Sequence, residues 1–174
     1  MSKKKAKKQK KSSGFKWFVF TLLLFAIAAA AARLTVFDVY KVTGDSMLPT
    51  YKIGDVIFSS RLIDVDELAR GTVVEAYLPG EDGLFLRRVY GLPGDKIEKR
   101  SDGTYLVYSL NGVMMEHPLG EASALEEGVI PNDKYLLLAD NSLADSRSFG
   151  LIDKANIKAE TKIIIWPWDR MFRG

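Results

Sequence analysis

The chain has 174 residues, 47% of them hydrophobic and 27% charged, which suits one compact domain and excludes a disordered tail. It has no cysteine and a single histidine, His117, so disulfides, a cysteine nucleophile and a multi-histidine metal site are excluded and a Ser-His-Asp triad is disfavoured. The net charge of +3 is uneven: eight lysines lie within residues 1–16, and the rest of the chain is more acidic than basic. We therefore expect no nucleic-acid partner and no metal or other cofactor.

An apolar segment follows the lysines. Residues Trp17–Ala32 are apolar except for Thr21, and Leu34–Phe37 are mostly apolar again after Arg33. A helix that spans a bilayer needs about 17–25 residues. We therefore expect a cytoplasmic basic tail over residues 1–15 and a transmembrane anchor over 16–37. The lysines would hold the amino terminus inside, and residues 38–174 would lie outside the cell membrane.

Two other interpretations of this segment stay open. A lysine-rich start, an apolar middle and the small residues Ala28–Ala32 also fit a cleavable signal peptide. A basic tail that binds DNA would explain the lysines but not the apolar segment.

From Asp38 onward, short β-branched and aromatic segments predict a mainly β domain. The predicted strands are Tyr40–Val42, Val56–Ser59, Thr72–Tyr77, Leu84–Tyr90, Tyr105–Ser109, Tyr135–Leu138 and Lys162–Trp166. Asn111-Gly112 is typical of a tight hairpin turn. Asp64–Arg70 predicts one or two helical turns that begin at an acidic cap.

Three polar segments could carry chemistry. In Thr43–Thr50, Gly44 would let the backbone turn and present the hydroxyl of Ser46, although an ordinary loop explains the same residues. Adjacent Arg87 and Arg88 on a strand would point to opposite faces, so at most one would face a core or cleft. Asp140–Arg147 follows a strongly apolar strand and is otherwise an Asx-rich turn.

In order, these segments resemble the type I signal peptidases, which are membrane-anchored serine proteases with a Ser-Lys dyad. The similarity runs from Lys16 to about Met171 and includes the boxes Gly44–Thr50, Gly54–Val56, Arg88–Asp95 and Asp140–Gly150, and the ending Ile165–Trp168. The short stretch before the last box is similar to the enzymes of Gram-positive bacteria. The resemblance implies a signal-peptidase-like β domain behind a retained amino-terminal helix.

The resemblance also implies roles for particular residues. Ser46 would be the nucleophile, and its backbone N–H would help to hold the oxyanion. Gly44 stands where some relatives have a serine, so Thr43 or the backbone would replace that hydroxyl. Gly44 and Asp45 would shape the oxyanion site. Met47, Leu48 and Pro49 would contact the substrate or the bilayer. Asp145 and Arg147 would pair and form a wall behind the dyad. Ser142 or Ser146 would orient the base.

The main departure from the family is Arg87, which stands where the family has its general-base lysine. A buried lysine can lose its proton near neutral pH, whereas arginine stays charged. Arg87 could stabilise an oxyanion but should not deprotonate Ser46. The last box is also about two residues shorter than usual, which leaves open which serine reaches the dyad.

The resemblance implies a membrane-bound endopeptidase that removes signal peptides from exported preproteins after small residues of the Ala-x-Ala type. Arg87 leaves three interpretations open. The chain could be a working enzyme that uses another base, for which Lys96 is nearest in sequence, or a weak or inactive homologue that binds exported or pilus proteins. It could also be a variant made to trap substrate. The expected partners are signal peptides and the lipid bilayer.

Overall fold

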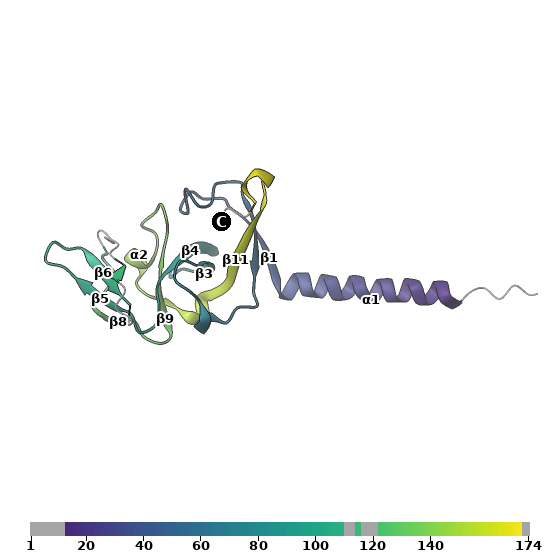
Figure 1. Cartoon of the computed structure of the whole chain (residues 1–174), viewed down its shortest axis with the longest axis horizontal. Coiled ribbons are helices and arrows are strands. Elements are labelled where there is room, and N and C mark those ends of the chain that lie inside the picture. The colour runs from purple at the N-terminus through teal and green to yellow at the C-terminus, as the bar shows by residue number, and fades with distance from the viewer. Residues whose placement is uncertain (1–12, 110–113, 116–121, 172–174) are drawn as a thin grey trace, which may run out of the picture. The chain divides into compact units, whose positions relative to one another are not determined.

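The computed structural model describes residues 13–109, 114–115 and 122–171. The chain divides after Thr35 into a helical unit and a β unit (Figure 1). The helical unit contains α1, Ser13–Thr35, whose window Gly14–Ala31 is long and apolar enough to cross a membrane. The helix fits a membrane anchor and ends two residues before the predicted boundary, because β1 begins at Phe37.

The β unit is built on a seven-stranded sheet with the order β1-β2-β11-β3-β4-β9-β10, in which every neighbouring pair is antiparallel. Its strands are β1 Phe37–Lys41, β2 Val56–Ser60, β3 Val73–Tyr77, β4 Leu84–Gly91, β9 Lys134–Leu138, β10 Ile152–Asp153 and β11 Ile157–Trp166. A mainly β fold behind one apolar amino-terminal helix is therefore confirmed.

A second, four-stranded sheet has the order β7-β6-β5-β8. Its strands are β5 Lys96–Lys99, β6 Tyr105–Tyr108, β7 Met114–Met115 and β8 Gly128–Val129. The short helices are η1 Val65–Glu67, α2 Ser146–Phe149, η2 Lys154–Asn156 and η3 Trp168–Arg170. Gly91 ends β4, and a Cβ there would lie 2.6 Å from the Ile130 side chain and 2.8 Å from Leu136, so only glycine fits.

Alternate residues of β4 face two different apolar clusters. Leu86 packs in a cluster with Met47 and Ile57, whereas Val89 belongs to a second cluster with Val74. Arg87 lies directly opposite Val74 in the β3–β4 register, so it shares the face of the second cluster. This register places the charged Arg87 side chain in the interior, beside the loop that contains Ser46.

All seven predicted strands are present, but β11 begins at Ile157 rather than Lys162. Register shifts in its pairings interrupt the simple alternation on which the prediction depended. The strands β5, β7, β8 and β10 were not predicted, because two to four residues show little alternation. Asp64 caps η1 by accepting from the Asp66 amide at 3.0 Å, which confirms one helical turn. The predicted Asn111-Gly112 turn lies outside the described residues.

Candidate active site

Ser46 lines a pocket of about 230 Å³. Three segments that are distant in sequence line it: the chain around Ser46, the β4 residues Phe85–Arg87, and Ser142 with Ala144. The fold therefore brings together the segment around Ser46, the strand that leads into Arg88–Asp95 and the segment Asp140–Gly150, which the sequence separates by up to about a hundred residues.

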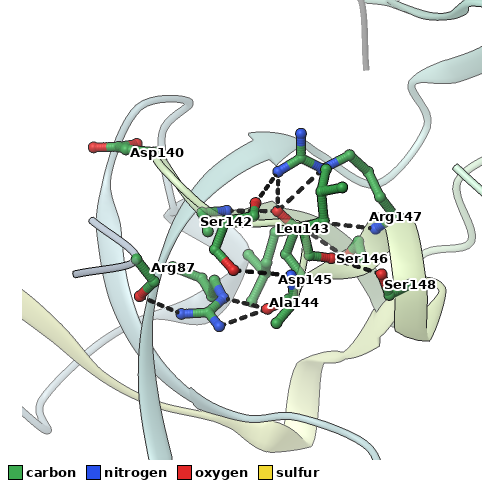
Figure 2. A network of polar contacts seen from close by, with 12 residues as sticks. Arg87, Asp140, Ser142, Leu143, Ala144, Asp145, Ser146, Arg147 and Ser148 are labelled. Atoms are coloured by element: carbon green, nitrogen blue, oxygen red, sulfur yellow. Dashed lines mark hydrogen bonds and ion pairs between the residues drawn. The ribbon is translucent and has the colours of Figure 1, made fainter. Parts of the chain in front are cut away.

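Arg87 is a buried cation on the wall of this pocket. Its side chain is 2% exposed, and its Nη1 donates to Ser46 Oγ at 3.2 Å and to the Leu86 carbonyl at 2.6 Å. Its Nε and Nη2 donate to the Ala144 carbonyl at 3.0 and 2.5 Å (Figure 2). Burial lowers the pKa of Arg87, and the negative charge of Asp145 opposes that effect. Arginine stays protonated in proteins, so the site holds a guanidinium cation, and each of these bonds uses an Arg87 N–H as donor.

An aromatic ring covers one side of the cation. The Phe85 ring centroid lies 5.4 Å from Arg87 Cζ, within the range of a cation–π contact. Phe85 also packs against the apolar cluster that contains Val89, as expected for residues that share the face of Arg87. A side chain at position 87 therefore experiences a largely dehydrated environment.

The Arg88 side chain points away from that of Arg87 and forms hydrogen bonds with other residues. Its Nε and Nη2 donate to Asp140 at 2.9 and 2.7 Å, and its Nη2 also donates to Thr50 Oγ1 at 2.9 Å. Thr50 Oγ1 in turn donates to Asp140 at 2.6 Å. Burial alone would raise the pKa of Asp140, but the hydrogen bonds from Arg88 and Thr50 hold its pKa below the ordinary value.

The residue after Asp140 reaches the nucleophile directly. The Asn141 amide donates to the Ser46 carbonyl at 2.8 Å, and its side-chain amide donates to the Asp45 carbonyl at 3.3 Å. Thr50, Arg88 and Asn141 thus position the nucleophile loop. Their positions inside the segments that resemble the family were a signal, but no role was predicted for them.

Asp145 is a fully buried carboxylate that organises the loop behind Arg87. It accepts from the Ala139 amide at 2.8 Å and from the Arg147 amide at 2.9 Å, and it caps α2. Arg147 also forms an ion pair with it at 2.5 Å and donates to the Ser142 carbonyl (Figure 2). These contacts fix the turn that presents the Ala144 carbonyl to Arg87.

The group that accepts from Arg87 Nε and Nη2 is the backbone carbonyl of Ala144, and not the hydroxyl of Ser142 or Ser146. Ser146 Oγ accepts from the Leu137 amide at 3.0 Å, and Ser142 Oγ accepts from the Ala144 amide at 3.1 Å. Ser146 is fully buried and joins α2 to β9, whereas Ser142 lines the pocket. The short loop places Ala144 where the guanidinium can reach it.

Two further expectations need correction. Met47 is 1% exposed and packs in the core with Tyr51 and Ile57, so it cannot contact a bilayer. It does line the pocket. Leu48 is half-buried and Pro49 is exposed.

Gly44 does not have the left-handed backbone that would demand glycine, and a Cβ there would meet no heavy atom within 4 Å. Its missing side chain widens the pocket instead of permitting a sharp turn.

Lys96, the alternative base, lies on β5 in the other sheet. It is outside the residues that line the Ser46 pocket, and it forms an ion pair with Glu98. The hydrogen bond with Glu98 raises the pKa of Lys96, which is the wrong direction for a general base.

Comparison with known proteins identifies the family. Residues 15–166 match the family model described as signal peptidase, peptidase S26. The chain belongs to this family. It is 29% identical over 180 residues to signal peptidase I S of Bacillus subtilis (strain 168), covering 93% of this chain and 94% of that protein. It is 30% identical over 172 residues to signal peptidase IB of Staphylococcus aureus (strain Mu50), covering 87% and 89%.

A crystal structure of a signal peptidase I from Enterococcus faecalis V583 is 21% identical, with a TM-score of 0.40, and the match covers 55% of this chain and 97% of that one. Membership of the signal peptidase family supports peptidase activity in signal-peptide processing, and the apolar helix α1 fits a membrane-anchored member.

Proposed function

We propose that this signal peptidase homologue cleaves signal peptides from exported preproteins after small residues, with Ser46 as the nucleophile. The observation that carries the proposal is that Ser46 lines a small pocket beside β4 and that its hydroxyl lies 3.2 Å from Arg87 Nη1. Ser46 would attack the peptide carbonyl, and the oxyanion would be stabilised by the Ser46 amide and by an N–H of Arg87.

The shape of the pocket supports a small residue before the cut. Ligand pockets usually measure about 300–1,000 Å³, and this one has about 230 Å³ with Phe85, Leu86 and Tyr40 on its walls. An extended peptide could add to β4 as a strand and place alternate side chains into such a pocket. Alanine would fit there, whereas a bulky residue would collide with the aromatic walls.

Proton transfer is the weak step of the proposed reaction. Ser46 must lose its proton during attack, but the neighbouring Arg87 guanidinium is the donor in each of its four hydrogen bonds here and does not accept a proton. No lysine occurs among the described residues that line the pocket. Because general-base catalysis contributes roughly 10²–10⁴-fold, we propose a slow enzyme.

A second function is favoured by the same guanidinium. A protein that keeps the pocket but holds Ser46 by a permanent donor could bind signal-peptide-like segments without cutting them. Such a homologue would act as a binding or assembly factor for exported or pilus proteins.

A paired binding and cleavage assay separates these functions. The full chain in detergent is mixed with a peptide whose signal ends in Ala-x-Ala, and slow cleavage after that motif that disappears in Ser46→Ala supports the enzyme. Binding without cleavage supports the assembly factor. Equal binding of peptides with alanine or tryptophan at both positions would contradict a signal-peptide site of either kind.

A further inference from the structure

One edge of β4 is unpaired beside the pocket. Within the described part of the chain, β9 pairs with β4 only from Arg88 onward, so no strand covers that edge from Leu84 to Arg87. The backbone groups of Val89 bond to Gly71 and Thr72, on the β3 side. Since strand backbone groups alternate, the carbonyls of Leu84 and Leu86 point to the open side. These carbonyls are the acceptors that an added peptide strand would use.

Both carbonyls already accept hydrogen bonds from side chains. Arg87 Nη1 donates to the Leu86 carbonyl at 2.6 Å, and the Tyr40 hydroxyl donates to the Leu84 carbonyl at 3.4 Å. The second bond is long and therefore easily broken. Tyr40 belongs to β1, which three strands separate from β4 in the sheet order, so its side chain reaches across the gap where the sheet curls.

We propose that Tyr40 is a specificity-determining residue that closes the far end of the substrate groove and competes with long peptides for the Leu84 carbonyl. The inference rests on the proposed function, which places the residues before the cut in this pocket. Leu84 lies three residues from Arg87, which is about 10 Å along a strand. A peptide residue that pairs there lies about three residues before the cut, and its N–H must displace the Tyr40 hydroxyl.

This competition should depend on peptide length. A peptide that starts two residues before the cut ends short of the Leu84 carbonyl, so it can contact the Tyr40 ring but does not displace the Tyr40 hydroxyl. A peptide that starts six residues before the cut must displace the hydroxyl. Arg87 caps the nearer carbonyl for both peptides, so the difference between the two lengths isolates Tyr40.

The test measures the dissociation constants of these two peptides by fluorescence anisotropy, with full-length protein in detergent that carries Ser46→Ala to prevent cleavage. Adding Tyr40→Phe keeps the ring and removes only the hydroxyl. We expect the long peptide to bind about fivefold tighter and the short peptide to be unchanged, as for one released neutral hydrogen bond.

Tyr51→Phe is the matched control. Tyr51 packs in the same core cluster as Tyr40, and its hydroxyl bonds to Thr161 Oγ1 at 3.2 Å, away from β4. It should change neither peptide. Weaker binding of the long peptide to Tyr40→Phe, or the same change for both lengths, would overturn the inference alone. Failure of both peptides to bind any form would overturn the proposed function as well.

Discussion

Arg87 and Asp145 are two buried charges that the fold stabilises in different ways. Arg87 donates to carbonyl oxygens and to Ser46, whereas Asp145 accepts from two backbone amides and from the Arg147 guanidinium. Removing one partner of a buried ion pair leaves an uncompensated charge, which costs more than the pair itself contributes. Asp145 should therefore be a major determinant of stability.

We predict that Asp145→Ala lowers the free energy of unfolding by about 3–5 kcal/mol, because Arg147 and the Ala139 amide lose their acceptor. Urea unfolding of the full chain in detergent, followed by circular dichroism, measures the change. Asp153→Ala is the matched control, since Asp153 forms a pair with Lys134 in which both side chains are at least a third exposed, and such a pair contributes at most about 1 kcal/mol. Equal losses in the two variants would contradict the role given to Asp145.

At the scale of elements, the loop after β9 holds the loop after β1. Asp140 binds Arg88 and Thr50, and Asn141 binds the Ser46 carbonyl, so the two loops and β4 form one unit. The η3 helix extends it, because Arg170 donates to the Thr50 carbonyl at 2.8 Å and pairs with Asp55 at 3.0 Å. The position of Ser46 therefore depends on segments at both ends of the β unit.

The contacts of Asp140 with Arg88 and Thr50 predict that the stability of the fold depends on pH. Because the pKa of Asp140 is lower in the folded state, its contribution to stability is complete above the unfolded pKa of about 4 and is lost as the pH falls through the folded pKa. Asp140→Asn should be less stable by about 1–2 kcal/mol at pH 6, and it should lose less stability on acidification to pH 3. Urea unfolding at the two pH values measures both effects. A variant with the same acid sensitivity as the present sequence would argue against a lowered pKa at Asp140.

The longer strands could be predicted from the sequence, but the short strands β5, β7, β8 and β10 and the contacts between the loops could not. Alternating β-branched residues marked segments such as Leu84–Tyr90, and the opposite directions of Arg87 and Arg88 followed from strand geometry. The bond from Thr50 to Asp140 joins residues 90 apart, and no local pattern reports it. An apolar residue in a loop, such as Met47, can face a core or a membrane, and only the packing shows that it faces the core.

At the scale of the whole molecule, charge and hydropathy are divided between the ends of the chain. Eight lysines precede Trp17, α1 is apolar, and the residues after it carry an acidic excess. A cytoplasmic excess of lysine fixes the orientation of a single anchor. This division predicts an amino terminus inside the cell and a β unit outside.

Protease added to intact spheroplasts should therefore digest the β unit, which an antibody against that unit would detect on a blot. A cytoplasmic marker protein should stay intact in the same sample. Protection of the β unit until the cells are lysed would reverse the proposed orientation.

We propose that this pocket is a signal-peptidase site in which Ser46 lacks a general base, because arginine stands at position 87 instead of lysine. The most direct test compares kcat/KM for an Ala-x-Ala peptide between the present sequence and Arg87→Lys, each with and without Ser46→Ala. Position 87 is 2% exposed and borders the Phe85 ring, so an introduced lysine would have a lowered pKa and could accept the serine proton. We predict at least about tenfold faster cleavage by Arg87→Lys and none in either Ser46→Ala form. Equal rates with arginine and lysine would contradict the claim.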